Sequence, residues 1–217
     1  MTQRDELAGI RQEYSRQSLS PEDCLPDPLA QLDRWLDEAL KSGLKDATAM
    51  HLATVGADGR PSARMVLLKG LEHGRLVFYT NYDSRKGEQL QANPVAAITF
   101  FWPDLERQVR IEGRVEVVPA EVSDAYFASR PYTSRIGAWA SLQSQPLDGK
   151  TTLVARAAKF SARYLHDVPR PPNWGGYALA PERLEFWQGR PSRLHDRVLY
   201  LPVAGKAGEW ERSRLYP

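Results

Sequence analysis

Residues 64–86 read RMVLLKGLEHGRLVFYTNYDSRK, and this stretch carries the signals that decide the fold. Its runs of β-branched and aromatic residues predict strands at Arg64–Lys69 and Leu76–Asn81, separated by a turn that contains two glycines. A helix is expected to start immediately afterwards, at Asp83 or Ser84. The stretch therefore predicts a β-hairpin that leads directly into a helix.

The cations of this stretch are spaced for more than one anion. Arg64 and Lys69 are five residues apart on one predicted strand, a separation of roughly 16 Å at ~3.3 Å per residue. Arg85 and Lys86 fall in the first turn of the expected helix, where positive charge is unfavourable unless an anion is bound. Free N–H groups at a helix start, together with a guanidinium and an ammonium, make a phosphate site. The alternative is that these cations are only solvated surface charges.

The composition bounds the class of protein. The chain has 217 residues and a formal net charge of +2 at pH 7, which suits a soluble globular protein and argues against a broad nucleic-acid surface. No apolar run approaches the ~18 residues of a membrane span, and the N-terminus lacks the apolar core of a signal peptide. We therefore expect a cytoplasmic protein. Its one cysteine and four scattered histidines show no metal-ligand spacing, so no metal is expected.

The remainder of the chain predicts further strands and helices. Expected strands cover residues 50–55, 62–69, 76–81, 95–102, 108–118, 174–180, 184–188, 193–201 and 210–216, and expected helices begin near Asp27, Ser84, Pro119 and Thr151. Short connections between the strands favour a mainly β fold with flanking helices (α+β), built on an antiparallel barrel, because closure removes exposed strand edges. We expect one domain over residues 1–217, with a mobile N-terminal segment at 1–20.

A first cluster of polar residues follows the strands. Tyr126, Arg130 and Ser134 recur at intervals of four, and Tyr126 and Arg130 would share one face of a helix. A phenol, a guanidinium and a hydroxyl that converge would suit a small phosphate. Pro131 makes one continuous helix through Ser134 improbable. The alternative for Tyr126 and Arg130 is an ordinary stacking pair at the surface.

Two further clusters lie near the C-terminus and on a central strand. Strand alternation would place Arg193, His195 and Arg197 on one face, where three cationic or titratable groups repel each other unless they line a polar or anionic pocket. Gln108 and Trp187 provide an amide and an indole that could edge a flat heterocycle. Both are also ordinary barrel residues, so they decide nothing by themselves.

Taken together, the motifs resemble the pyridoxamine 5'-phosphate oxidases, flavin enzymes that make pyridoxal 5'-phosphate. The motifs are RMVLLK (64–69), FYTNYDSRKG (78–87), ERQVRIEG (106–113), SRPYTSRIGAWAS (129–141) and FWQGRPSRLHDR (186–197). The combination of RLHDR with the SRK helix start is the most specific feature. The resemblance runs from about Arg11 to the C-terminus.

The resemblance implies a split β-barrel homodimer with FMN bound between subunits. It assigns FMN contacts to Arg64, Met65, Val66, Leu67, Leu68, Lys69, Tyr79, Thr80, Arg85, Lys86, Gln108, Gln143, Ser144, Trp187 and Arg197. It assigns substrate contacts to Arg11, Tyr14, Lys69, Tyr126, Arg130, Ser134, Arg193 and His195. Of these positions, the resemblance places Arg193, His195 and Arg197 next to the reacting atoms as catalytic residues.

The reaction that the resemblance implies is oxidation of pyridoxamine or pyridoxine 5'-phosphate by O2, which gives pyridoxal 5'-phosphate, H2O2 and, from the amine, ammonia. In such an enzyme the flavin performs the redox chemistry and the protein positions the reacting carbon. Two alternatives remain open. One is an NAD(P)H-dependent flavin reductase on the same barrel, which would not need the Tyr126, Arg130 and Ser134 set. The other is a non-catalytic carrier of flavin or pyridoxal phosphate.

Overall fold

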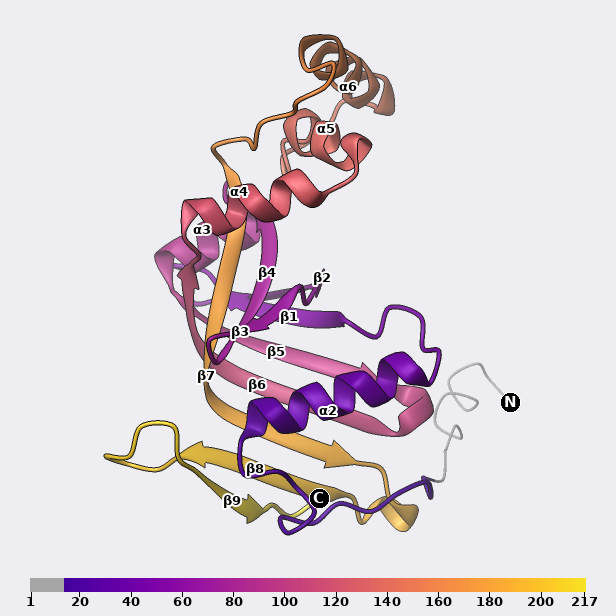
Figure 1. The fold of residues 1–217 in the computed structure, drawn as a ribbon, viewed down its shortest axis with the longest axis vertical. Coiled ribbons are helices and arrows are strands. Elements are labelled where there is room, and N and C mark those ends of the chain that lie inside the picture. Colours follow the sequence, from indigo (N-terminus) through magenta and orange to yellow (C-terminus); the bar gives the residue numbers. More distant parts are fainter. Residues whose placement is uncertain (1–13) are drawn as a thin grey trace. The chain divides into compact units, whose positions relative to one another are not determined.

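The computed structural model describes residues 14–217, and Figure 1 shows the order of the elements. The helices and strands are α2 (Pro28–Lys41), β1 (Ala49–Val55), β2 (Pro61–Leu67), β3 (Gly70–Glu72), β4 (Arg75–Asn81), α3 (Arg85–Ala92), β5 (Val95–Trp102), η1 (Pro103–Leu105), β6 (Arg107–Val117), α4 (Ala120–Ser129), α5 (Tyr132–Ala140), α6 (Lys150–Arg163), β7 (Trp174–Gln188), η2 (Pro191–Arg193), β8 (Asp196–Pro202) and β9 (Trp210–Arg214). Within the described part of the chain, no helix is long and apolar enough to cross a membrane.

The strands form one sheet, in which β1–β2, β3–β4, β4–β7, β7–β8 and β8–β9 pair antiparallel. Seven of the strands follow the order β2-β1-β5-β6-β7-β4-β3, while β8 pairs with β7 and β9 pairs with β8. Helices flank this sheet (Figure 1). The predicted mainly β fold with flanking helices is confirmed.

Two compact units make up the chain. Unit 1 comprises Met1–Ala47, described from Tyr14 onward, with Thr99–Ile111 and Arg183–Pro217. Unit 2 comprises Thr48–Ile98 and Glu112–Glu182. The strands β5, β6 and β7 each contribute residues to both units.

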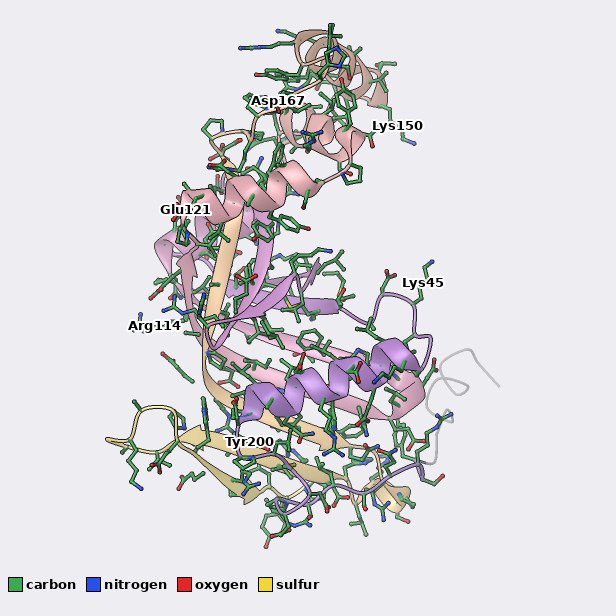
Figure 2. All side chains as sticks on the ribbon, viewed as in Figure 1. Lys45, Arg114, Glu121, Lys150, Asp167 and Tyr200 are labelled. Atoms are coloured by element: carbon green, nitrogen blue, oxygen red, sulfur yellow. The ribbon has the colours of Figure 1, made fainter. Side chains whose placement is uncertain are left out.

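The core of unit 1 is an aromatic cluster beneath α2. The helix begins as predicted, because the Asp27 side chain accepts a hydrogen bond from the Leu29 amide at 2.9 Å and Pro28 occupies the first helical position. Its buried stripe includes Trp35, whose ring meets Phe186 edge-on at 5.2 Å between centroids. Tyr200, labelled in Figure 2, is fully buried and packs against Phe186 in the same way at 5.5 Å.

In unit 2 the predicted hairpin is replaced by two different strand pairings. β2 pairs with β1, whereas the predicted turn contains β3, which pairs with β4 through a tight turn at His73 and Gly74. The chain changes partner at one point, because the Leu68 amide bonds to the Thr48 carbonyl and the Lys69 amide bonds to the Val77 carbonyl. Both turn residues have positive φ, which glycine adopts freely.

Two other predicted boundaries were wrong. The strands expected at 174–180 and 184–188 form one strand, β7, because Pro181 keeps an extended backbone and removes only one hydrogen-bond donor. The strand expected at 193–201 begins only at Asp196. The residues before it form η2, in which Ser192 and Arg193 both have positive φ.

Gly113 of β6 provides a test of how tightly unit 2 packs. A Cβ atom at this position would lie 2.0 Å from the Ala180 carbonyl oxygen, and neither backbone can move away without breaking the sheet. We expect Gly113→Ala to lower the free energy of unfolding by about 2–3 kcal/mol, as overpacked sites do. Gly149→Ala is the matched control, since its new Cβ meets only the Thr151 hydroxyl at 3.7 Å. Urea unfolding measures both variants, and equal stabilities would contradict this packing.

Candidate functional site

Unit 2 contains a cavity of about 580 Å³ that opens among β4, α4, α5 and the start of β7. Its lining residues are Leu67, Lys69, Tyr79, Thr80, Asn81, Tyr126, Arg130, Pro131, Ser134, Gly137, Ala138, Ser141, Gln143 and Trp174. The cavity therefore brings together Tyr126, Arg130 and Ser134, which the sequence grouped by spacing, with Lys69 from the opening stretch. Sequence reasoning missed Trp174, which stands in no polar cluster, and Asn81, which belongs to the opening stretch but was not assigned a ligand contact.

Stacked aromatic rings form one wall of this cavity. The rings of Tyr79 and Tyr126 lie 3.8 Å apart and 11° from parallel, and Trp174 stacks on Tyr79 at 5.6 Å. The Arg130 guanidinium lies over the Trp174 ring, 4.6 Å from its centroid. This contact places the guanidinium against the aromatic wall of the cavity.

Arg130 carries a charge that the surrounding residues leave unsatisfied. Its Nη1 atom is buried and has no hydrogen-bond partner among residues 14–217. Burial lowers the pKa of Arg130, because the charged form loses hydration. A buried, unpartnered guanidinium N–H is costly, so an anion in the cavity would relieve that cost.

The helix break at Pro131 brings Arg130 and Ser134 into the same cavity. α4 ends at Ser129, Arg130 is its C-cap in an extended conformation, and Pro131 caps the start of α5. The predicted interruption of the helix is confirmed. The convergence of Tyr126 with Ser134 comes from this sharp turn between two helices rather than from one helical face.

The second cationic group surrounds Lys86 at the start of α3. Ser84 caps the helix, as predicted, and Lys86 follows in its first turn. The Lys86 Nζ donates hydrogen bonds to Thr80 Oγ1 at 2.9 Å, to Gln143 Oε1 at 2.8 Å and to Ser84 Oγ at 3.2 Å. The side chain is only 8% exposed, and burial followed by repulsion from Arg64 lowers the pKa of Lys86 to about 8.

Arg64 is held by neutral oxygen atoms only. Its guanidinium donates to the Leu52 carbonyl at 3.1 Å, to Thr54 Oγ1 at 2.6 Å and to Ser62 Oγ at 2.5 Å. Burial and then the nearby charge of Arg85 lower the pKa of Arg64. Within residues 14–217, no carboxylate forms an ion pair with either Arg64 or Lys86. The two cations therefore lack a counter-ion, as a phosphate site requires.

The other residues predicted to bind FMN on this side occupy varied positions. The Arg85 amide donates to Ser144 Oγ at 3.2 Å, and Ser144 itself has a left-handed backbone with φ 75°. Met65 and Leu67 are exposed on β2, while Leu68 is buried and Val66 is half-buried. Of these four residues of the opening stretch, only Leu67 lines the cavity.

Unit 1 holds the second group of predicted site residues, and three of its rings are in contact. Trp187 and His195 have centroids 4.7 Å apart, and Tyr14 meets both rings edge-on, at 5.7 and 5.8 Å. Gln108 is half-buried on β6. Arg11 lies outside the described residues.

The predicted row of Arg193, His195 and Arg197 on one strand is wrong. Arg193 belongs to η2, His195 lies in the connection that follows, and only Arg197 is on β8. Pro191 disrupts strand geometry here, and the positive φ of Ser192 and Arg193 reverses the chain. Two consecutive non-glycine residues in the left-handed region are strained, and such strain is common at binding sites.

His195 has its protonation state set by the backbone. The Arg190 amide donates a hydrogen bond to His195 Nδ1 at 3.1 Å, so that nitrogen must be the acceptor. Burial, followed by the charge of Arg193, lowers the pKa of His195. The ring is therefore neutral near pH 7, with its proton on Nε2 available to donate.

Arg197 is paired with a buried carboxylate that sequence reasoning missed. Its Nε and Nη2 donate to the two oxygens of Glu185 at 2.9 and 3.0 Å, and Glu185 is only 3% exposed. This bidentate pair raises the pKa of Arg197 and fixes its orientation. The signal in the sequence was a single acid inside the otherwise apolar run LEFW, at 184–187.

The described residues contain no group of three or more His, Cys, Asp or Glu that could hold a metal ion. Unit 2 offers a cavity lined by Lys69 and Arg130 and a cationic group around Lys86, and unit 1 offers an aromatic cluster that contains His195. The first arrangement can bind phosphate groups, and the second can contact a flat ring.

Comparison with known proteins gives consistent matches over nearly the whole chain. A family model described as pyridoxamine 5'-phosphate oxidase matches residues 36–188, and one described as the pyridoxine 5'-phosphate oxidase C-terminal dimerisation region matches residues 174–217. A pyridoxine/pyridoxamine 5'-phosphate oxidase of Chromobacterium violaceum is 65% identical over 97% of this chain and 98% of its own length. The Burkholderia multivorans protein of that name is 60% identical over 97% of this chain and 99% of its own length.

Among solved structures, PhzG from Burkholderia lata 383, in complex with tetrahydrophenazine-1-carboxylic acid, superposes with a TM-score of 0.86. It is 30% identical, and the match covers 94% of this chain and 100% of the PhzG chain. An FMN-binding protein from Nostoc punctiforme superposes with a TM-score of 0.69 at 21% identity, covering 93% of this chain and 100% of its own. The second similarity supports the fold alone.

The buried position of Lys86 predicts a pH-dependent stability. Because the pKa of Lys86 is about 8 in the folded chain and 10.5 in the unfolded chain, unfolding takes up a proton between these values. The stability of the ligand-free protein should therefore rise relative to Lys86→Met, by about 1–2 kcal/mol between pH 7 and 9.5. Urea unfolding of both proteins at several pH values measures the difference. If the stabilities of the two proteins changed in parallel with pH, burial would not lower the pKa of Lys86.

Proposed function

Because the chain belongs to the pyridoxamine 5'-phosphate oxidase family, we propose that it is an FMN-dependent oxidase of pyridoxamine 5'-phosphate or pyridoxine 5'-phosphate. The products are pyridoxal 5'-phosphate and H2O2, with ammonia released from the amine, and O2 is the electron acceptor. The observation that carries the proposal is the pair of cationic groups in unit 2. The reaction requires two bound molecules, FMN and the substrate, and each of them bears a phosphate.

The residues around Lys86 fit the phosphate of FMN. Lys86 is buried and Arg64 is half-buried, both have neutral partners only, and the charge of Arg85 acts on Arg64. A phosphate dianion placed here would supply the missing counter-charge and would raise both lowered pKa values. The N-terminus of α3 would add the positive end of its helix dipole to the same site.

The cavity next to this group fits the phosphate of the substrate. Lys69, Tyr126, Arg130 and Ser134 all line it, and they supply an ammonium, a phenol, a guanidinium and a hydroxyl. The unpartnered Nη1 of Arg130 is the group that gains most from an anion. The stack on Trp174 fixes the guanidinium before ligand arrives, so little entropy is lost on binding.

When bound, FMN supplies hydride acceptance from C4' of the substrate and reoxidation by O2. The chain contributes orientation and a suitable environment. His195 would donate its Nε2 proton in a hydrogen bond to the substrate, since Nδ1 is occupied by the Arg190 amide. Arg193 would pair with an anionic group of the substrate, and Arg197, held by Glu185, would contact the flavin with Gln108 and Trp187.

A homodimer is part of this proposal. The match to a C-terminal dimerisation region covers residues 174–217, which include β7, β8 and β9. Exposed apolar side chains on other strands support a protein interface, among them Met65 on β2 and Phe101 on β5, at 60% and 55% exposure.

The relatives favour this function over the other open possibilities. The matched oxidases are 60–65% identical to this chain, whereas PhzG is 30% identical. A flavin reductase or a flavin carrier would need the Lys86 group but not a second phosphate site around Arg130. The presence of both cationic groups supports the oxidase.

The direct test of the function is an anaerobic titration of the FMN-loaded protein with pyridoxine 5'-phosphate. We expect the flavin absorbance to bleach in proportion to added substrate and to return, with H2O2, when air is admitted. The same titration with NADH should leave the flavin oxidised. A flavin that bleaches with NADH but not with pyridoxine 5'-phosphate would favour the reductase, and a flavin that bleaches with neither would favour the carrier.

Two substitutions separate the two phosphate sites. Lys86→Ala should raise the Kd for FMN roughly 10–100-fold, the usual cost of a lost hydrogen bond to a charged group. Arg130→Ala should instead raise the KM for pyridoxine 5'-phosphate by a similar factor while FMN stays bound. Lys150→Ala, at an exposed lysine labelled in Figure 2, is the control and should change neither. The opposite pattern of losses would exchange the two assignments.

Arg193 should act on the substrate alone. We expect Arg193→Ala to lower kcat/KM at least tenfold, which corresponds to about 1.4 kcal/mol. Arg193 is exposed on a left-handed backbone, and in the proposed function its guanidinium pairs with the substrate. FMN content should equal that of the unaltered protein. Arg60→Ala removes another exposed arginine and should have no effect. Unchanged kinetics for Arg193→Ala would exclude the residue from the site.

A further inference from the structure

The Glu106 carboxylate of unit 1 binds the backbone of a segment some ninety residues away in sequence. Its Oε2 accepts hydrogen bonds from the amides of Ser15 and Arg16, both at 3.0 Å. A carboxylate that accepts two backbone N–H groups makes a charge-assisted contact stronger than a neutral hydrogen bond. The two amides belong to the residues immediately after Tyr14, so this contact fixes the backbone from which the Tyr14 side chain projects.

Glu106 holds this position at the cost of backbone strain. It is the C-cap of η1, with φ 55° and ψ 38° in the left-handed region that glycine favours. Its amide bonds to the Pro103 carbonyl, and its own carbonyl accepts from the Gly189 amide at 2.7 Å. A left-handed conformation costs a residue with a side chain roughly 1–2 kcal/mol. A glutamate rather than a glycine here indicates that the side chain has a use.

Tyr14 packs closely against Gly189, next to the side chain of Glu106. A Cβ atom on Gly189 would lie 2.7 Å from Tyr14 Cγ and 3.0 Å from Glu106 Cβ, so this surface admits the tyrosine only because position 189 is glycine. From there the Tyr14 ring meets Trp187 and His195 edge-on. Tyr14 therefore covers the histidine whose Nε2 is free to donate.

Separate contacts hold the segment further along. The Gln17 carbonyl accepts from Arg190 Nη1 at 3.1 Å, and the Leu19 amide donates to Asp196 Oδ2 at 3.0 Å. These contacts anchor the chain after Arg16. Among the described residues, Glu106 is thus the side chain that holds the backbone next to Tyr14.

We propose that Glu106 is a positioning residue whose carboxylate holds the backbone of Ser15 and Arg16 and thereby places Tyr14 against His195 and Trp187. This inference rests on the proposed function, in which His195 contacts the substrate, and on the family resemblance, which assigns Tyr14 to the substrate as well. Loss of the carboxylate would release the Tyr14 end of the segment, while the anchors at Gln17 and Leu19 remain. Substrate binding would then weaken without loss of the fold.

Two variants test this role without disturbing the turn. Glu106→Gln keeps the length of the side chain but removes the charge that binds two amides. Glu106→Gly removes the side chain and relieves the left-handed strain, so it guards against misfolding. Glu209→Gln is the control, because Glu209 is an exposed acid paired with Lys206 at 3.0 Å.

The first measurement uses the FMN-free protein and needs no activity. Trypsin cleaves after Arg16 only when that backbone is free, and mass spectrometry identifies the fragment that begins at Gln17. We expect both Glu106 variants to release this fragment at least fivefold faster than the unaltered protein, without a loss of Tm. Glu209→Gln should cleave at the original rate. Equal cleavage rates in all four proteins would overturn the proposal.

The second measurement uses the FMN-loaded protein. Glu106→Gln should raise the KM for pyridoxine 5'-phosphate about five- to tenfold with kcat and FMN content nearly unchanged, and it should add nothing in a Tyr14→Ala background. Faster cleavage with unchanged KM, or additive effects with Tyr14→Ala, would overturn the positioning role. If the unaltered protein does not oxidise pyridoxine 5'-phosphate, the proposed function fails, and the cleavage rates alone decide whether Glu106 holds the segment.

Discussion

Positive charge that is buried or half-buried and has no counter-ion is the constraint on which the site in unit 2 depends. Lys86 and Arg64 donate only to hydroxyl, amide and carbonyl oxygens, and Arg130 leaves one buried N–H without any partner. A chain that folds around such groups loses stability, because charged groups lose hydration when they are withdrawn from water. The lowered pKa values of all three groups reflect this loss. An anion bound beside these groups would restore that stability, which is why we propose them as phosphate sites.

The sequence predicted this part well because its signals are local. The strand at 95–102, the Ser84 cap and the helix break at Pro131 depend on a few neighbouring residues, and each was found where it was expected. The convergence of Tyr126, Arg130 and Ser134 on one cavity followed from the same local signals. The detailed assignment of ligand contacts came from family resemblance, and it remains a prediction.

Other parts of the structure depend on contacts that sequence spacing does not reveal. The chain changes strand partner between Leu68 and Lys69, whose amides bond to the carbonyls of Thr48 and Val77. Thr48 is distant along the chain, so local spacing does not reveal this change. The alternation over 193–197 was misleading, because Pro191 and two left-handed residues replace a strand with a turn. Glu185 and Glu106 were not singled out, since an isolated acid becomes informative only when its partner is known. In each case tertiary structure overrode a local pattern.

The central claim is that unit 2 has separate phosphate sites at Lys86 and Arg130, and a crystal structure of the protein with FMN and pyridoxal 5'-phosphate tests it most directly. The account predicts one phosphate within hydrogen-bonding distance of Lys86 and Arg64, and the other in contact with Arg130 and Lys69. A complex in which Lys86 and Arg130 contact neither phosphate would contradict it.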